Sequence, residues 1–339
     1  MSDLDESRLS AWLASAVPDA GAFSVQKFSG GQSNPTYRLV GASRDLVLRR
    51  KPFGALLPSA HAIEREFRLL TALETTDLRV PHPIALCEDP AVIGVPFYLM
   101  EMVTGRNYFN ATLPDVPKAE RRGMYASMVD TLARLHNIEP AKVGLADYGR
   151  PGNYFGRQVE RWTKQYRAAQ TTVIPEMERL IAWLPTNLPA PDRVSIIHGD
   201  YRIDNLIYHE SSPAVAAVLD WELSTLGDPL ADFGNLAMNW ILPSDGRSAL
   251  DGLDLASEGL PTLDETIARY CLATKRDGIA SLHWLFAYNL FRGAGILQGI
   301  RKRLLDGNAS SEDAAEIAAK VEPFARAGWQ EARKAGAPA

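Results

Sequence analysis

The sequence predicts an α+β fold with two lobes, from three observations. Short segments of alternating apolar and polar residues dominate roughly the first hundred residues, whereas long helical patterns dominate after about residue 117. The chain has 339 residues, which exceeds the usual size of one domain core. The pattern changes near residues 100–105. We therefore expect an N-terminal lobe over residues 1–103 and a mostly helical C-terminal lobe over residues 104–339.

The N-terminal lobe is expected to contain an antiparallel meander and one helix. Turn residues separate its alternating segments, as in a meander. Ile63, Phe67 and Leu70 recur at helical spacing after a capping serine. These patterns predict strands at Phe23–Phe28, Thr36–Gly41, Asp45–Arg50, Ile84–Asp89 and Pro96–Val103, and a helix at Ser59–Leu73.

The C-terminal lobe is expected to be helical apart from three short apolar strands near its middle. Two of them flank the polar stretch "HGDYRIDN", and the third is "AVAAVLD", Ala214–Asp220. Periodicity of about 3.6 residues identifies the helices. They are predicted at Lys118–Ile138, Phe155–Ala169, Pro229–Trp240, Leu263–Thr274, Ile279–Leu305 and Ser311–Ala335.

Composition excludes several classes of protein. The formal net charge is −5, which disfavours a dedicated nucleic-acid-binding protein. Cys87 and Cys271 are the only cysteines, which indicates a reducing compartment rather than a disulfide framework. The acidic N-terminus does not have the pattern of a secretory signal, and polar residues interrupt the most apolar segment, 282–297. We expect a cytoplasmic protein that does not bind membranes; nothing in the sequence indicates its oligomeric state.

The polar stretch "HGDYRIDN" is the first indication of chemistry. His198, Gly199 and Asp200 are followed by Asn205 five residues after Asp200, and Asp220 lies at the end of the next apolar strand. Phosphoryl transfer needs a carboxylate to accept the proton of a hydroxyl and hard oxygen ligands for Mg²⁺. Asx residues also build ordinary turns, but a turn alone does not require Asp220. The spacing therefore favours a phosphotransferase.

The longer segments "HGDYRIDNLIY" and "VLDWELSTLGDPLADFGNLAM" resemble the aminoglycoside phosphotransferase and choline kinase family. Within it, the sequence is most similar to the kinase domain fused to some acyl-CoA dehydrogenases. The resemblance implies a protein-kinase-like two-lobed fold that uses ATP and Mg²⁺. It makes Asp200 the catalytic base and Asn205 and Asp220 the metal ligands. Arg202 occupies the place of a protein-kinase lysine that meets the transferred phosphate, although it could equally be a surface arginine.

The same resemblance assigns nucleotide-binding residues in the N-terminal lobe. Gly30, Gly31, Gln32 and Ser33 fall where a phosphate-covering loop belongs, although such residues also form ordinary hairpins. The family's strand lysine aligns with Arg49, with Lys51 as a substitute, and its helix glutamate aligns with Glu66. Backbone groups of Glu101 and Met102 are expected to meet the adenine. The substitution of arginine for lysine is a departure from the family pattern.

Two further residues are expected to support the catalytic loop. In the family, the equivalent of His198 orients the loop and the equivalent of Asp232 braces it from below. Trp221 and Glu222 replace the Phe-Gly of protein kinases, which indicates the small-molecule branch.

The acceptor is the least defined part of the prediction. A basic stripe, Arg157, Arg161, Lys164 and Gln165, could bind an anionic group such as a coenzyme A phosphate, or be a solvated helix face. Whether Trp284, Tyr288 or Arg292 lines the acceptor pocket stays open. We expect a small-molecule hydroxyl acceptor, with a hydroxyacyl-CoA and an aminoglycoside as competing candidates. A nucleotide-binding module without transferase activity is the alternative from another class.

Overall fold

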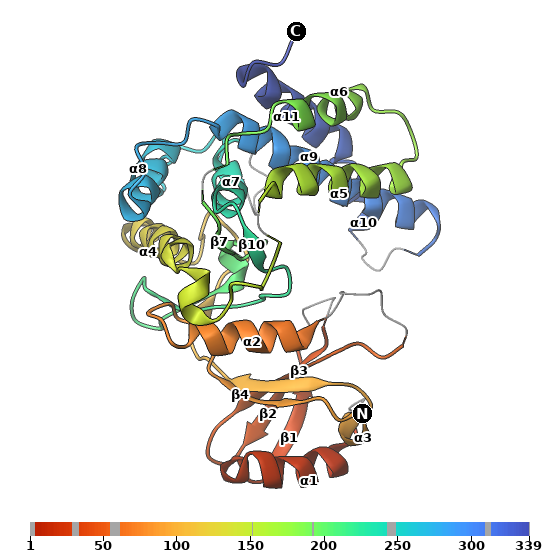
Figure 1. Cartoon of the computed structure of the whole chain (residues 1–339). Helices are drawn as coiled ribbons and strands as arrows, with labels where there is room; N and C mark the ends of the chain where they lie inside the picture. Colours follow the sequence, from red (N-terminus) through yellow and green to blue (C-terminus); the bar gives the residue numbers. More distant parts are fainter. Residues whose placement is uncertain are drawn as a thin grey trace.

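The computed structural model describes residues 4–28, 34–54, 62–150, 152–191, 193–242, 249–308 and 313–338. It has a lobe built around a β-sheet and a larger helical lobe (Figure 1), which confirms the predicted α+β arrangement. The last strand of the sheet lobe ends at Glu101, and the first strand of the helical lobe begins at Arg106. No helix within the described ranges is long and apolar enough to cross a membrane.

The N-terminal lobe is a five-stranded antiparallel sheet with a helix on each face. Its strand order is β1-β2-β3-β5-β4. The strands are β1 (Phe23–Lys27), β2 (Thr36–Gly41), β3 (Leu46–Arg50), β4 (Pro83–Cys87) and β5 (Phe97–Glu101). Helix α1 (Glu6–Ala16), with the short α3 (Pro90–Ile93), covers one face, and α2 (Ile63–Leu73) covers the other (Figure 1).

Helix α2 connects the two lobes. Its buried residues Leu69 and Leu70 belong to the same apolar cluster as the core of the helical lobe. Leu9 and Leu13 of α1 instead pack with Leu46 and Leu48 of β3 in a separate cluster. The alternation of a strand therefore places the neighbouring residue of β3, Arg49, on the opposite, α2 face of the sheet.

The helical lobe supports two small sheets beside the predicted catalytic loop. Strands β7 (Ser195–Ile197) and β10 (Thr225–Gly227) form one, and β6 (Arg106–Asn107), β8 (Leu206–Tyr208) and β9 (Val215–Val218) form the other. The loop of residues 198–205 runs from β7 to β8, and Asp220 follows β9. The longer helices are α4 (Lys118–Asn137), α5 (Tyr154–Ala169), α6 (Pro175–Trp183), α7 (Leu230–Ala237), α8 (Leu263–Thr274), α9 (Leu282–Leu305) and α11 (Val321–Lys334).

The structure corrects the prediction in several places. Helices α1 and α6, the short helix α3 and strands β6 and β10 were not expected. The helix expected at Ser311–Ala335 is two helices, α10 (Ala314–Ala318) and α11. Pro323 explains the break, because its ring would clash with the carbonyl of Ala319 in a continuous helix. Pro229–Trp240 is likewise α7 followed by a short 3₁₀ turn at its end.

Candidate active site

The catalytic loop is anchored on a buried carboxylate. Asp232, in the first turn of α7, accepts hydrogen bonds from the backbone N–H groups of His198 (2.6 Å) and Gly199 (2.8 Å). The imidazole of His136 lies 3.3 Å from the same carboxylate. Burial opposes ionisation of Asp232, but these contacts outweigh it and lower the pKa of the carboxyl. The buried, charged Asp232 therefore fixes the start of the loop.

His198 is enclosed within the loop rather than directed at a substrate. Its side chain is fully buried, and Nε2 lies 2.8 Å from the carbonyl of Leu219. Nδ1 accepts a hydrogen bond from the backbone N–H of Asp200 at 3.2 Å. This pattern requires the proton on Nε2. The ring thus links the catalytic loop to the segment before Asp220, which fits an orienting role.

Backbone conformation explains two residue choices at the site. Gly199 has φ +85°, and a Cβ there would lie 2.6 Å from the carbonyl oxygen of Leu223. Only glycine fits this close approach without strain. Asp220 has φ +61°, a left-handed conformation that is uncommon for a residue with a side chain. Such conformations concentrate at functional sites, where the surroundings hold them in place.

Asn205 connects the other predicted polar residues. Its Nδ2 donates to the backbone carbonyl of Asp200 at 2.9 Å and lies 3.3 Å from the Asp200 carboxylate. The backbone N–H of Leu219, next to Asp220, donates to the Asn205 carbonyl at 2.8 Å. The amide oxygen of Asn205 and the carboxylate of Asp220 are hard oxygen donors, which suit Mg²⁺. The residues present therefore fit the expected metal.

The structure brings Arg49, and not Lys51, to Asp220. The guanidinium of Arg49 forms ion pairs with Glu66 (2.9 Å), Asp220 (2.9 Å) and Glu222 (3.1 Å). The ammonium of Lys51 pairs instead with Glu64. Arg49 and Lys51 thus each pair with a different glutamate of α2. Of the two, Arg49 is the one that faces the predicted metal ligand.

Glu66 has an unusual electrostatic environment. Burial raises the pKa of its carboxyl from 4.5 to about 7, although Arg49 opposes the shift. Tyr98 donates a hydrogen bond to one carboxylate oxygen (3.1 Å), and Asn34 donates to the other (3.0 Å). Burial also opposes the charge of Arg49, but the surrounding acidic groups raise its pKa above the usual value. The pair is therefore held rigidly beneath the sheet.

The structure gives less information about the other residues that are predicted to bind the nucleotide. Gly30, Gly31, Gln32 and Ser33 lie outside the described residues. The backbone N–H of Glu101 donates to the carbonyl of His82 at 2.9 Å, so this donor is already used within the lobe. Glu101 and Met102 border a surface cavity with Arg38 and His82.

Arg202 lies near Asp200, the predicted base, but is paired with another residue. Its guanidinium forms an ion pair with Asp204, and its side chain is 46% exposed. Arg202 and Asp200 nevertheless border the same cavity. The structure therefore places Arg202 near the predicted base without showing a contact between their side chains.

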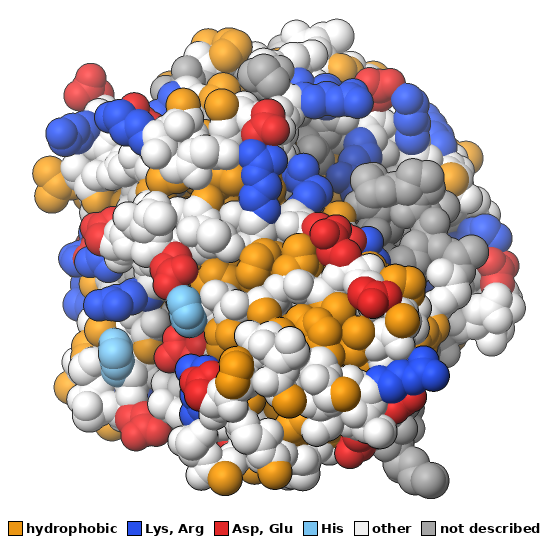
Figure 2. Space-filling model, turned by 60° about the horizontal axis from the view of Figure 1, so that its bottom comes forward, with side chains coloured by type: hydrophobic (Ala, Val, Ile, Leu, Met, Phe, Trp, Pro, Cys, Tyr) orange, Lys and Arg blue, Asp and Glu red, His pale blue; other side chains and the backbone are white. Residues whose placement is uncertain are grey.

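A cavity of about 650 Å³, here called the basic cavity, opens next to the catalytic loop. Gly199 and Glu222 line it, together with four arginines from distant parts of the chain: Arg65, Arg150, Arg161 and Arg292. The guanidinium of Arg292 donates to the carbonyl of Gly199 at 2.9 Å. Figure 2 shows Lys and Arg side chains gathered in the upper half of the face it presents. An anionic group would fit the basic cavity.

Only part of the predicted basic stripe faces this cavity. Arg161 lines it, whereas Arg157 donates to the backbone carbonyls of Arg150 and Gly152, and Lys164 pairs with Glu160. Gln165 does not line it.

The three residues of α9 that are candidates for the acceptor pocket do not all line the basic cavity. Tyr288 and Arg292 line the basic cavity, but Trp284 does not. Trp284 is buried, and its ring stacks on that of Tyr288 with centroids 5.6 Å apart. Tyr288 and Arg292 therefore stay candidates for the acceptor pocket, whereas Trp284 does not border this cavity.

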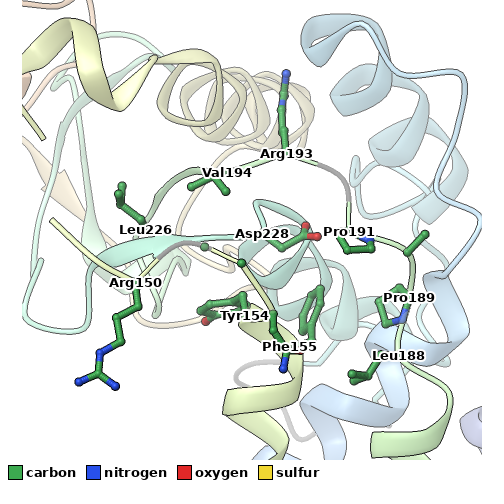
Figure 3. A pocket seen from close by; sticks show the side chains of 14 residues that line it. Arg150, Tyr154, Phe155, Leu188, Pro189, Pro191, Arg193, Val194, Leu226 and Asp228 are labelled. Atoms are coloured by element: carbon green, nitrogen blue, oxygen red, sulfur yellow. The ribbon is translucent and has the colours of Figure 1, made fainter. Parts of the chain in front are cut away.

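A second cavity, of about 390 Å³, lies on the other side of Tyr154 (Figure 3). It shares Arg150 and Tyr154 with the basic cavity. Figure 3 shows Leu188 and Pro189 on one side of it and Val194 and Leu226 on the other. None of the residues predicted to be catalytic or metal-binding lines this cavity.

Comparison with known proteins identifies the family. Residues 24–266 match the family described as "Phosphotransferase enzyme family". The chain belongs to this family. It is 46% identical over 319 residues to acyl-CoA dehydrogenase family member 10 of Mus musculus, covering 93% of this chain and 30% of that protein. It is 41% identical over 336 residues to acyl-CoA dehydrogenase family member 11 of Homo sapiens, covering 96% and 43%. The chain thus spans less than half the length of these relatives.

Solved structures confirm the protein-kinase-like fold of this phosphotransferase. A protein of Ralstonia eutropha described as a candidate aminoglycoside phosphotransferase has a TM-score of 0.90 and 45% identity, covering 98% of this chain and 99% of that one. The aminoglycoside phosphotransferase APH(4)-Ia, solved with ADP and hygromycin B, has a TM-score of 0.60 at 12% identity, covering 97% and 99%; it shows the fold alone. The chain is a small-molecule phosphotransferase.

The sequence alone did not indicate a role at the candidate site for several residues that lie there. Glu222 was noted only for its departure from protein kinases, yet it contacts Arg49 and lines the basic cavity. Arg65 and Arg150 were not singled out. An acidic residue two positions after Asp220 is a local signal for Glu222. The arginines have no such signal, because only the fold brings them together.

Proposed function

We propose that this phosphotransferase transfers the γ-phosphate of ATP, with Mg²⁺, to a hydroxyl of an anionic small molecule. Residues 1–103 would bind the nucleotide, and residues 104–339 would supply the catalytic loop and the acceptor site. The observation that supports the proposal is the arrangement of Asp200, Asn205 and Asp220 beside Arg49 and the basic cavity. Phosphoryl transfer depends on positioning and charge stabilisation of this kind.

Each side chain has a defined task in this proposal. Asp200 accepts the proton of the acceptor hydroxyl as its oxygen bonds to the γ-phosphorus and ADP leaves. Arg49 holds phosphate oxygens of the nucleotide, oriented by Glu66. Asn205 and Asp220 would hold Mg²⁺, which neutralises developing charge on the phosphates when bound. His198 and Asp232 keep the loop in place.

The acceptor that we propose is a hydroxyacyl-CoA. Arginines are suited to phosphates because the guanidinium can form two parallel hydrogen bonds. Arg65, Arg150, Arg161 and Arg292 provide four such groups next to the catalytic loop. They would repel a polycation such as an aminoglycoside. The names of the curated relatives, acyl-CoA dehydrogenases, are consistent with a CoA-linked acceptor.

An acceptor panel tests the proposed function. ADP release with Mg²⁺-ATP would be measured for hydroxyacyl-CoAs and aminoglycosides, with Asp200→Asn as the matched control. We expect turnover of hydroxyacyl-CoAs that falls by about 10²–10⁴-fold in the control, the usual contribution of a general base. Turnover retained in Asp200→Asn would contradict the assigned base. ATP binding without transfer to any acceptor would instead favour the nucleotide-binding module, and turnover of aminoglycosides alone would reject the CoA-linked acceptor.

A further inference from the structure

Asp200 borders a third cavity, which is distinct from the basic cavity and from the cavity at Tyr154. It encloses about 240 Å³ and is here called the chain cavity. Arg292 lines both cavities. The apolar side chains that line the chain cavity include Phe109, Leu236, Met238, Leu242, Ile296 and Phe324. The predicted catalytic carboxylate thus borders a cavity with both polar and apolar walls, and its neighbour Gly199 lines the basic cavity.

Two of these apolar side chains are exposed to an unusual degree. Phe109 is 62% exposed and Ile296 is 43% exposed. Exposed apolar side chains that lie singly on a surface need no explanation, but a cluster around a functional group marks a binding site. A ligand that covers Phe109 and Ile296 would remove apolar surface from water, which favours binding.

A buried amide gives the chain cavity a polar feature as well. Asn289 is 2% exposed, and its Nδ2 donates to the carbonyl of Leu285 at 2.9 Å. Its Oδ1 is buried and has no hydrogen-bond partner among the described residues. A buried acceptor without a partner is costly, so such a group usually has one in the functional state. A hydrogen-bond donor on a ligand in the chain cavity would satisfy it.

The charged residues at the chain cavity do not favour an ionic ligand. Arg202 is paired with Asp204, and the guanidinium of Arg292 contacts Gly199, which lines the basic cavity. Two other amides, Asn235 and Asn239, complete the polar lining. The cavity therefore suits an uncharged, mainly apolar group with a hydrogen-bond donor.

We infer that the chain cavity binds the neutral alkyl chain of the acceptor and sets its permitted length. This inference rests on the proposed function. The anionic end of the acceptor occupies the basic cavity, the reacting hydroxyl lies at Asp200, and the carbon chain beyond it contacts Phe109 and Ile296. Ile296 then determines chain-length specificity without taking part in the chemistry.

Ile296→Trp tests the inference, because the larger side chain fills the cavity from a position that is already exposed. The matched control is Leu304→Trp, on the same helix and 37% exposed, which lines neither cavity. Hydroxyacyl-CoAs of increasing chain length would be the acceptors. In Ile296→Trp we expect kcat/KM for the longest acceptors to fall by about 10-fold or more, the scale of discrimination in a hydrophobic pocket. The shortest acceptors and the KM for ATP should change by less than about 2-fold in both variants.

Calorimetric binding of the same acceptors gives a second measurement that does not depend on turnover. The affinity gained with each added methylene should disappear in Ile296→Trp. It should weaken in Phe109→Ala, which shortens another apolar side chain that lines the chain cavity. A uniform loss across all chain lengths, or equal effects of Ile296→Trp and Leu304→Trp, would overturn the inference while leaving the proposed function intact. Failure of the unaltered protein to bind or phosphorylate any hydroxyacyl-CoA would reject the proposed function itself.

Discussion

At the scale of single residues, the guanidinium of Arg49 does what a lysine could not. It contacts Glu66, Asp220 and Glu222 at once, because its donors form a planar fork. A single ammonium on the same strand would not reach all three with comparable geometry. Strand alternation predicted that Arg49 and Lys51 share a face. It could not distinguish them, because the choice depends on which glutamate of α2 lies opposite each cation.

Arg49→Lys keeps the positive charge, but we expect it to lose the simultaneous contacts with the three carboxylates around Arg49. We expect the KM for ATP to rise by about 10-fold, the cost of one hydrogen bond to a charged group. Lys51→Ala, which breaks only the contact with Glu64, should change it by less than about 2-fold. Initial rates at varied ATP concentration would measure both. The reverse order of effects would mean that Lys51 holds the nucleotide.

Glu66→Gln is expected to alter how stability depends on pH. The folded pKa of Glu66, about 7, exceeds its usual 4.5, so the folded state binds more protons between these values. The stability of the unaltered protein therefore falls as pH rises through this window, by up to about 3 kcal/mol from this group. The variant lacks the titrating group and should gain stability relative to it from about pH 5 to about pH 8. Urea unfolding at several pH values would show this; parallel curves would contradict it.

At the scale of elements, the regular helices were the most predictable part of the fold and the short strands the least. The pattern at Leu263–Thr274 gave the bounds of α8 because its apolar spacing is clear and Thr262 forms a capping box with Glu265. Strands β6 and β10 span two and three residues, too few for any periodicity to emerge. Their pairing depends on partners far along the chain.

Asp232→Asn is expected to damage the contact between α7 and the catalytic loop. An amide is uncharged and can accept only with its oxygen, so one of the two backbone N–H groups of His198 and Gly199 loses its acceptor and the other keeps only a neutral one. We expect a loss of about 2–3 kcal/mol in the free energy of unfolding, measured in urea, together with reduced kcat. Asp277→Asn, at an exposed position, should change stability by less than about 0.5 kcal/mol. Full stability in the Asp232 variant would show that the anchor is not needed.

At the scale of the whole molecule, an acidic chain encloses a strongly basic cavity. The net charge of −5 gave no sign of it, because charge composition does not report where charges gather. The contacts within the predicted catalytic loop join residues that are close in sequence, so the sequence could indicate them as a group. The basic cavity was not, because Arg65, Arg150, Arg161 and Arg292 come from α2, a loop, α5 and α9.

Arg161→Gln tests the charge of this cavity. We expect the KM for a hydroxyacyl-CoA to rise by about 10-fold, the scale of one charge-assisted hydrogen bond, with the KM for ATP unchanged. Lys164→Gln is the control, because Lys164 lies on the same helix and pairs with Glu160. The KM of the unaltered enzyme should also rise with salt, and more steeply than that of the Arg161 variant. Equal effects of the two substitutions would place the anionic group elsewhere.

The anchor at Asp232 also has a consequence for how the protein folds. The two hydrogen bonds to His198 and Gly199 span 34 and 33 residues of chain, so they close a long loop. Closing such a loop costs entropy that is recovered only when the intervening strands and α7 have docked. We therefore expect the loop of residues 198–205 to acquire its shape late, together with the lobe's core. We expect a newly synthesised chain to form its N-terminal sheet early. The predicted active site would be complete only after α7 has docked against the loop of residues 198–205.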